Sequence, residues 1–497
     1  MRIEISNIHC KLEIGGTDHL YHPNLMKIFR EYMSVEVDGA FFINKHLPFH
    51  YDGKRYFITP KGKMATGFLP TFLRYLDREH PDLDVELKDN RGYFPAFSDT
   101  FVDRIGSVTI TEEYIHQRHM IECYKHNIEF RGITIPFPRG IIDAATNAGK
   151  TAIMAGIYLN MKEKEKMLVI IHSKVVFKQL VDMMTDVFGE VGQINATKYI
   201  IKPVTIAMIQ TLYSRRDDLN LRKDLNQFTI LAYDEAHKSG SSQSSKVLVH
   251  CPAPMRVFVS GTAFDSSDTV NNLIAIGLSG PKLGGVSKKY LMDKKISTPV
   301  KVHMRVCNTV LDYPVLDYRE CMDMMIHYSK ERVDEMRKII LERTEAGPIL
   351  IAVNFTQHGQ FLMDELSKSL PEDILIEFSH GKDSDQVEKV EAFKQGQIDV
   401  LISTGILKEG VNLPLIQTLI YAIGEMAKVS VKQWMGRIER KHESKDVAMM
   451  YDFYDIGKFV RKHSENRLLC YQAENVEIEL DFDIHKVKSL RTIIKRN

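Results

Sequence analysis

Short, almost wholly apolar runs alternate with longer helical patterns from about residue 104 onward. The runs are "MLVIIHS" (167–173), "FTILAYD" (228–234), "RVFVSG" (256–261), "PILIAVNF" (348–355), "DVLIST" (399–404) and "TLIYAI" (418–423). Strands that are apolar on both faces are typical of parallel sheets covered by helices on either side. The segments between them, such as 173–189, place apolar residues at helical spacing. The sequence therefore predicts a doubly wound α/β architecture, with enough chain for two such sheets.

Differences in composition and residue pattern divide the chain into four parts. Residues 1–103 are rich in aromatic residues and turns, carry two helical patterns and predict a small α+β accessory domain. A long polar helical stretch follows residue 297, so we expect one α/β domain over 104–296 and a second over 297–475. The short tail 476–497 is acidic first and then basic.

Composition narrows the class of protein. The 66 Lys and Arg residues balance 65 Asp and Glu residues, and the net charge of +1 neither indicates nor excludes a local basic groove. The six cysteines include no Cys-x-x-Cys pair, which argues against a zinc site and against a disulfide framework. The sequence shows no signal peptide and no apolar run long enough to span a membrane. We therefore expect a cytoplasmic protein without a membrane partner.

The segment "IIDAATNAGKTAIM" (141–154) leads from an apolar run through a polar loop into a helical pattern. It matches a Walker A phosphate loop in which alanine replaces the first glycine. Backbone N–H groups of such a loop converge on phosphate, its lysine reaches the β- and γ-phosphates, and its hydroxyl binds Mg²⁺. An ordinary strand–turn–helix junction is the alternative. The predicted ATP contacts are Ala144, Thr146, Asn147, Ala148, Gly149, Lys150 and Thr151, with Lys150 also catalytic and Thr151 also a metal ligand.

A second motif, Asp-Glu-Ala-His, closes the apolar run 228–234. Asp234 can hold Mg²⁺ directly or through water, and Glu235 can position or activate the attacking water. His237 completes the predicted catalytic group. Two carboxylates at a strand end can simply be solvated, but downstream of a phosphate loop they predict hydrolysis of a nucleoside triphosphate.

Asp-Glu-Ala-His after a Gly-Lys-Thr loop resembles the superfamily 2 helicases and translocases, whose motor consists of two tandem RecA-like domains. The resemblance implies that Gln117 reads adenine, unless it lies on a plain polar helix face. It also implies contacts with the nucleic-acid backbone from Ser173, Gln179, Thr205, Gln210 and Thr211. Coupling between nucleotide state and the acidic motif is implied for Ser260 and Thr262, whose alternative role is to cap strand ends.

The second α/β domain carries two further motifs of this family. "LISTGILKEGVNLP" (401–414) implies nucleic-acid contacts from Thr404 and Gly405 and nucleotide contacts from Gly410 and Asn412, although Asn412 stands where an aspartate is usual. "KQWMGRIERK" (432–441) resembles the arginine-finger motif, with Gln433, Arg437 and Arg440 as its catalytic residues. Guanidiniums three residues apart would share one helix face and neutralise charge on the γ-phosphoryl group. A solvated basic face is the alternative, and we expect Trp434 to pack rather than to bind.

The N-terminal region contains "VEVDGAFF" (35–42), then Tyr51-Asp52-Gly53 and a second helical pattern. This order is similar to the leader of the phage UvsW-type helicases, which are close to the XPB-like branch. The resemblance implies an ATP- and Mg²⁺-dependent DNA helicase of phage repair, recombination and replication, with residues 1–103 as a DNA-binding domain. Its partners would be D-loops, R-loops with their RNA, and DNA junctions, and we expect a monomer in the host-cell cytoplasm. The alternatives are an RNA helicase, the motor subunit of a restriction complex, and a non-motor annealing or binding protein.

Overall fold

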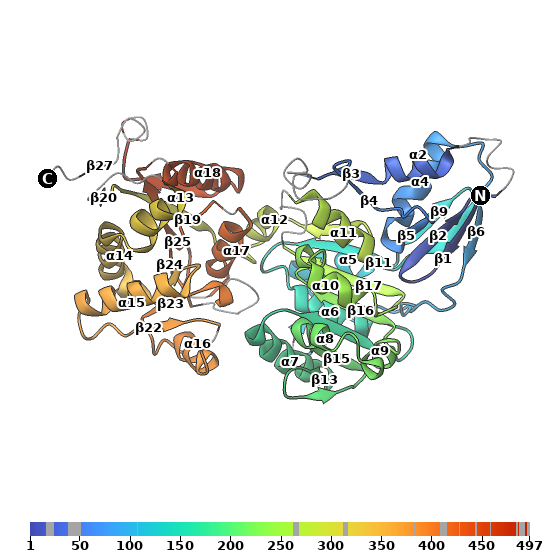
Figure 1. Cartoon of the computed structure of the whole chain (residues 1–497). Coiled ribbons are helices and arrows are strands. Elements are labelled where there is room, and N and C mark those ends of the chain that lie inside the picture. The colour runs from blue at the N-terminus through green and yellow to red at the C-terminus, as the bar shows by residue number, and fades with distance from the viewer. Residues whose placement is uncertain are drawn as a thin grey trace. The chain divides into compact units, whose positions relative to one another are not determined.

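The chain forms two compact units, Met1–Ser287 and Lys288–Asn497, in a computed structural model (Figure 1). The structure describes residues 1–15, 24–37, 51–106, 108–261, 268–311, 317–381, 383–407, 415–426, 428–442, 445–457, 459–483, 486 and 493–494. Over these residues, no helix combines the length and the apolar character that crossing a membrane requires.

The N-terminal part of the first unit is built on a mixed four-stranded sheet in the order β5-β2-β1-β6. Side chains along β1 and β2 alternate between buried and exposed, so one face of this sheet packs on a core. The elements of this N-terminal part are β1 (Arg2–Ile5), β2 (His9–Glu13), α2 (Leu25–Tyr32), β3 (Ser34–Glu36), β4 (Lys54–Tyr56), β5 (Lys63–Ala65), η1 (Thr66–Phe68), α4 (Leu69–Glu79) and β6 (Glu86–Asp89). Strands β3 and β4 pair with each other in a separate two-stranded sheet.

A hairpin beyond residue 103 completes this N-terminal core. Strands β9 (Asn127–Phe130) and β10 (Ile133–Pro136) contribute Ile128, Phe130 and Ile135 to the same apolar cluster as α2 and α4. Between the two strands, Arg131 donates a hydrogen bond to the carbonyl of His80 at 3.0 Å. The apolar core of the accessory region therefore extends to about residue 137.

The remainder of the first unit is a sheet of eight described strands in the order β14-β13-β15-β12-β16-β17-β11-β18. All neighbouring strands are parallel except β13 and β14. The strands are β11 (Arg139–Ala144), β12 (Met167–Ile171), β13 (Gly192–Ile194), β14 (Tyr199–Ile200), β15 (Val204–Met208), β16 (Ile230–Asp234), β17 (Met255–Ser260) and β18 (Lys282–Val286).

Helices form two layers on this sheet. One layer is formed by α5, α6 and α7, which contact one another in series, and the other by α8, α10 and α11 (Figure 1). The helices are α5 (Ile115–Glu122), α6 (Lys150–Leu159), α7 (Lys174–Phe188), α8 (Ile209–Ser214), α9 (Leu219–Leu225), α10 (Ser242–Leu248) and α11 (Thr269–Ser279).

The second unit is built on a parallel sheet of seven described strands in the order β22-β23-β21-β24-β25-β19-β26. Its strands are β19 (Val300–Cys307), β21 (Ile349–Ala352), β22 (Ile376–Ser379), β23 (Val400–Ser403), β24 (Thr418–Tyr421), β25 (Ala448–Asp455) and β26 (Glu477–Leu480). Its helical elements are α12 (Lys288–Asp293), α13 (Tyr318–Met322), the π-helical turn η4 (Asp323–His327), α14 (Lys330–Arg343), α15 (Thr356–Ser369), α16 (Gln386–Lys394), α17 (Lys428–Ile438) and α18 (Val460–Ala473).

The two parallel-sheet domains confirm the predicted α/β class. The six apolar runs of the sequence form β12, β16, β17, β21, β23 and β24. Strand β12 is buried at every position, as is β24, which is the burial that a sheet covered on both faces requires. The apolar runs identified strands correctly because burial on both faces leaves no room for polar side chains.

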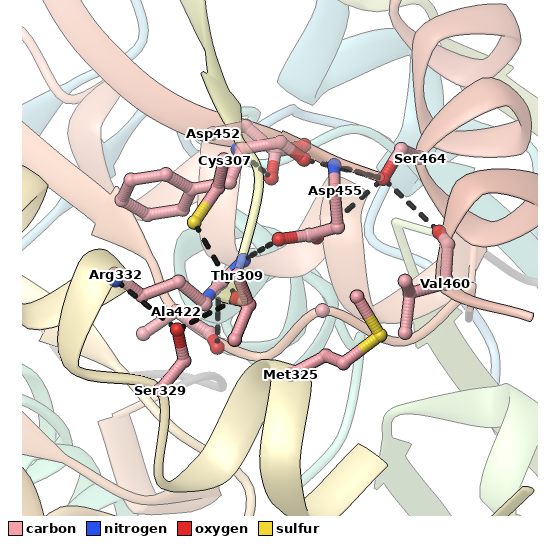
Figure 2. Close-up of polar contacts among 12 residues, drawn as sticks. Cys307, Thr309, Met325, Ser329, Arg332, Ala422, Asp452, Asp455, Val460 and Ser464 are labelled. Carbon is pink, nitrogen blue, oxygen red and sulfur yellow. Dashed lines mark hydrogen bonds and ion pairs between the residues drawn. The ribbon is translucent and has the colours of Figure 1, made fainter. Parts of the chain in front are cut away.

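Two buried arginines neutralise two buried aspartates in the second unit. Arg467 pairs with Asp452, with 2.8 Å between Nε and Oδ2, and Arg332 pairs with Asp455. Figure 2 shows Arg332 and Asp455 together with Ser464, whose hydroxyl accepts from the Asp455 N–H at 3.1 Å. Breaking such a pair from one side leaves a charge buried without its partner, which is costly.

The same arginines bind the connection that leads from β24 to α17. Arg332 donates to the carbonyl of Ala422 at 3.1 Å, and Arg467 donates to that of Gly424 at 2.7 Å (Figure 2 shows the first of these residue pairs). The ion-pair network therefore fixes the backbone that precedes α17.

Replacing Arg467 by methionine should destabilise the second unit, because the Asp452 carboxylate would remain buried without its cation. We expect the free energy of unfolding to fall by about 3–5 kcal/mol. Urea unfolding followed by the fluorescence of Trp434 measures this unit, because Trp434 is the only tryptophan and is fully buried there. Lys462→Met, an exposed position on α18, is the matched control. Equal midpoints for the two variants would show that the network does not stabilise the fold.

Candidate functional site

Three of the predicted motifs follow three neighbouring strands of the first parallel sheet. The phosphate loop follows β11, the coupling motif follows β17 and the acidic motif follows β16. Asp143 is in register with Ser260, and Asp234 with Val259. Because parallel strands end at the same edge, the ends of these three strands lie side by side where open α/β sheets bind their ligands.

The phosphate loop has the backbone of an anion site. Asn147 and Gly149 have φ angles of 72° and 80°, and α6 begins directly afterwards at Lys150. The first N–H groups of a helix lack intrahelical partners and carry the positive end of its dipole. A side chain at position 149 would place its Cβ 2.2 Å from Gln117 Nε2. Glycine is therefore required there both by the backbone conformation and by a close neighbour.

Gln117 lies against this loop. Its Nε2 donates to the Ala148 carbonyl at 3.3 Å, and His116 Nε2 lies 3.2 Å from the same oxygen. Burial lowers the pKa of His116, so its ring is neutral near pH 7. Among the residues that the structure describes, the buried Oε1 of Gln117 has no hydrogen-bond partner. An unsatisfied amide oxygen beside a phosphate loop fits an amino-bearing ring such as adenine.

The acidic motif contains strained backbone and a short hydrogen-bonded series. Glu235 adopts a left-handed conformation, with φ of 64° and ψ of 61°, which is uncommon for residues other than glycine. His237 Nδ1 lies 3.0 Å from Ser260 Oγ and 3.4 Å from Glu235 Oε2. Ser260, at the end of β17, and the Glu235 carboxylate thus approach the same ring nitrogen of His237, which can hydrogen-bond to either of them. Thr262, the other predicted coupling residue, lies outside the described residues.

The ligands predicted for Mg²⁺ are the Thr151 hydroxyl in the first turn of α6 and the Asp234 carboxylate at the end of β16. In the described ranges, no group of three or more His, Cys, Asp or Glu side chains is arranged to hold a metal. Mg²⁺ usually keeps several waters and binds one or two protein groups together with substrate phosphates. The residues therefore fit Mg²⁺ that arrives with a triphosphate.

The residues predicted to touch nucleic acid fall into two groups. Ser173 immediately precedes α7, while Gln210 and Thr211 begin α8, after the neighbouring strand β15. Gln210 Nε2 donates to the His172 carbonyl at 2.9 Å, which joins the turns after β12 and β15. Gln179 lies further along α7 and is partly buried. Gln210 and Thr211 also line a surface hollow of about 430 Å³.

Thr205 cannot make the backbone contact expected of it in this fold. It lies near the beginning of β15, is fully buried, and is separated from Gln210 by the length of the strand. Its hydroxyl donates to the Lys202 carbonyl at 2.7 Å and accepts from the Lys202 N–H at 3.0 Å. The hydroxyl satisfies the local backbone and does not face solvent.

Thr404 and Gly405 follow β23 in the second unit. Thr404 is buried, whereas Gly405 is exposed and has open space where a Cβ would stand, so its backbone is accessible. Gly410 and Asn412 lie outside the described residues.

The arginine-finger segment differs from its expected geometry. Gln433 and Arg437 are buried residues of α17, but the helix ends at Ile438, and Arg440 instead forms an antiparallel bridge with Ser297. The Thr298 N–H donates to the Glu439 carbonyl at 2.7 Å, which draws the chain out of the helix. The two guanidiniums therefore do not share one helix face. Burial and the charge of Arg437 lower the pKa of Arg440 to about 9, so it remains charged at neutral pH.

Several supporting groups gave no signal in the sequence. Lys445 is buried and donates to the carbonyl of Ile438 at 2.9 Å and to that of Ile416 at 3.0 Å, so it caps the end of α17. Burial lowers the pKa of Lys445 to about 8. Lys288 forms an ion pair with the buried Glu439, which lies between Arg437 and Arg440 in the sequence. The contacts of Lys445 with Ile416 and of Lys288 with Glu439 join segments that are distant in sequence, which explains why local patterns did not reveal them. Trp434 is fully buried, as expected.

Comparisons with known proteins match both units. A family described as "Type III restriction enzyme, res subunit" matches residues 111–265, and the "Helicase conserved C-terminal domain" matches residues 331–442. The putative ATP-dependent helicase IRC3 of Saccharomyces cerevisiae is 24% identical over 383 residues, which cover 71% of this chain and 53% of IRC3. The ATP-dependent DNA helicase uvsW of Enterobacteria phage T4 is 22% identical over 354 residues, which cover 67% of this chain and 68% of uvsW. The chain thus spans about half of the first relative and about two thirds of the second.

The fold has a counterpart among solved structures. S. cerevisiae Dbp5 bound to RNA and ADP BeF3 matches with a TM-score of 0.53 at 14% identity, covering 76% of this chain and 96% of that chain. This match shows a shared two-domain RecA-like fold. The family matches to both α/β domains and the two relatives support a superfamily 2 helicase that is similar to the UvsW type.

Proposed function

We propose that the chain is an ATP-dependent DNA helicase or translocase that unwinds or remodels branched DNA, such as D-loops, R-loops and junctions. The observation that carries this proposal is the contiguous edge formed by the phosphate loop, the acidic motif and Ser260 in a superfamily 2 fold. The similarity to the ATP-dependent DNA helicase uvsW of Enterobacteria phage T4 supports the DNA substrate. We further propose a role in phage DNA repair, recombination or replication.

In this proposal the first domain binds and cleaves ATP. Gln117 reads adenine through its unsatisfied Oε1, and Lys150 binds the β- and γ-phosphates at the start of α6. Thr151 and Asp234 would hold Mg²⁺, which would neutralise phosphate charge when bound. Glu235 positions the attacking water and accepts its proton.

The second domain supplies the remaining groups. Arg437, supported by Gln433 on the same helix, neutralises charge that develops on the γ-phosphoryl group, and Arg440 adds a second cation from beyond that helix. Gly410 and Asn412 complete the nucleotide contacts. ATP binding closes the two domains, and hydrolysis lets them open.

Nucleic acid is held by its backbone in this proposal, without reading of base sequence. Ser173, Gln179, Gln210 and Thr211 bind it in the first domain, and Thr404 and Gly405 bind it in the second. The series Ser260–His237–Glu235 relays the nucleotide state to these contacts, because it connects two of the three turns at the nucleotide edge.

The first experiment compares ATP hydrolysis with single-stranded DNA, duplex DNA, forked DNA and RNA. We expect forked DNA to stimulate hydrolysis most. Lys150→Ala should lower the stimulated rate by about 10²–10³-fold, because it removes a charge from the transferring phosphate. Lys164→Ala, an exposed lysine beyond α6, should leave the rate unchanged.

Other outcomes of that experiment select other functions. Stimulation by RNA alone would favour an RNA helicase, as in the RNA-bound Dbp5 match. Activity only in the presence of a partner protein would favour a restriction motor, the role described for the first family. Full strand displacement by Lys150→Ala would favour a non-motor annealing protein.

Ser260→Ala should uncouple hydrolysis from unwinding, because it removes the hydroxyl that His237 contacts at 3.0 Å. We expect the ratio of base pairs opened to ATP consumed to fall by about 5-fold or more, the effect of losing roughly 1 kcal/mol of hydrogen bonding. Ser242→Ala, at an exposed position of α10, is the control. An unchanged ratio for Ser260→Ala would remove this hydrogen bond from the coupling route.

A further inference from the structure

A cavity of about 210 Å³ opens in the second unit among three segments that carry no predicted site residue. These segments are α13 with η4, the start of α15, and the connection from β24 to α17. The α15 segment follows β21, whose neighbour is β24, so the cavity lies at the carboxyl edge of the second sheet. The lining residues that matter here are Tyr318, Asp323, Tyr328, Phe355, His358 and Glu425.

Three aromatic side chains surround the cavity and remain about half exposed. Tyr318, Tyr328 and Phe355 have exposed fractions of 47%, 44% and 48%. Neighbours hold two of them in place: Tyr318 packs edge-on against Phe459, with ring centroids 5.8 Å apart, and Tyr328 against Phe361, at 5.3 Å. Large aromatic surface grouped in this way marks a binding site rather than scattered surface residues.

A buried histidine forms the polar part of the cavity. His358 is 1% exposed, and within the described part of the chain neither of its ring nitrogens has a hydrogen-bond partner. Burial, with the nearby charges of His327 and Arg332, lowers the pKa of His358 well below its usual range, so the ring is neutral. A neutral imidazole offers one donor and one acceptor, and leaving both unused in the interior is costly. The cavity therefore suits a ligand that presents both a donor and an acceptor.

Two carboxylates add acceptors. Asp323 Oδ1 lies 2.9 Å from His327 Nδ1, and Glu425 Oε2 accepts from Asn354 Nδ2 at 2.7 Å. Each carboxylate keeps further acceptor capacity beyond the bond it makes. Arg319 also lines the cavity and offsets one of these negative charges. The two carboxylates remain acceptors that suit amino groups. The cavity volume of about 210 Å³ is below the roughly 300–1,000 Å³ of typical ligand sites. The cavity therefore suits one ring system rather than a whole nucleotide.

We propose that this cavity receives one unstacked base of the bound nucleic-acid strand, with a preference for bases that carry an exocyclic amino group. The aromatic rings stack on the base, the His358 ring pairs with its edge, and a carboxylate accepts from its amino group. The inference rests on the proposed function, because it requires that the chain bind a strand. The base site would add contact with a base to a motor that is otherwise expected to hold only the sugar–phosphate backbone of the nucleic acid.

The test measures the affinity of the full chain for three 12-nucleotide strands: oligo-dC, oligo-dT and the same sugar–phosphate backbone without bases. Base–aromatic stacking predicts that oligo-dC binds about 5- to 100-fold more tightly than the bare backbone. Phe355→Ala and Tyr328→Ala should remove most of that difference. Leu341→Ala, which truncates a 44% exposed side chain on α14 of the same unit, should preserve it.

His358→Leu separates hydrogen bonding from stacking, since it keeps the cavity lined while removing both ring nitrogens. We expect this variant to lose part of the preference for oligo-dC over oligo-dT, because the carboxylate contact with the amino group remains, with unchanged Trp434 fluorescence as the sign of an intact fold. An undiminished preference for oligo-dC would overturn the role of His358. Equal affinity of the parent chain for oligo-dC and for the bare backbone would overturn the cavity's role as a base site.

Stimulation of ATP hydrolysis by the same strands distinguishes failure of the base site from failure of the proposed motor function. If no strand binds or stimulates hydrolysis, the proposed motor function fails, and the base site fails with it. If the bare backbone binds and stimulates as well as oligo-dC does, the motor function stands and the base site alone is wrong.

Discussion

Parallel strands end at a common edge, and this constraint positions every group at the nucleotide edge of the first domain. The turns after β11, β17 and β16 are neighbours because those strands are neighbours. Gly149 then determines what the first turn can do: its left-handed backbone starts α6, and the absence of a side chain admits the Gln117 amide. Gly149 thus provides the anion site and the place beside it for the Gln117 amide. The order of the strands brings the end of β16, with Glu235 directly after it, to the same edge of the sheet.

In the second domain, buried ion pairs hold a backbone connection in place. Arg332 and Arg467 are neutralised by aspartates of β25, and both also hold carbonyls of the connection between β24 and α17. That connection leads to the helix of Gln433 and Arg437 and supplies Glu425 to the aromatic cavity. One network therefore supports both the proposed cation for hydrolysis and the proposed base site, and both would be displaced if the connection moved.

The sequence revealed features that depend on local pattern and missed those that depend on distant segments. Buried strands and the phosphate loop were readable because each requires particular residues at fixed spacing. The position of Arg440 was wrong because pairing of its backbone with Ser297, more than 140 residues earlier, ends α17 at Ile438. Thr205 was misassigned because a motif gives residue order but not the end of the strand on which a hydroxyl lies. The cavity around His358 draws on three separate segments, and no local pattern could have predicted it.

The proposal on which the account most depends is that Arg437 takes part in hydrolysis of the triphosphate bound at the phosphate loop. The most direct measurement compares nucleotide affinity with hydrolysis in Arg437→Ala, with Trp434 fluorescence as the check on folding. If Arg437 has this role, affinity for a non-hydrolysable ATP analogue should stay within a few fold, while DNA-stimulated hydrolysis falls by about 10³-fold or more, as expected for loss of an arginine finger. Hydrolysis at the parent rate by a folded Arg437→Ala chain would contradict the account.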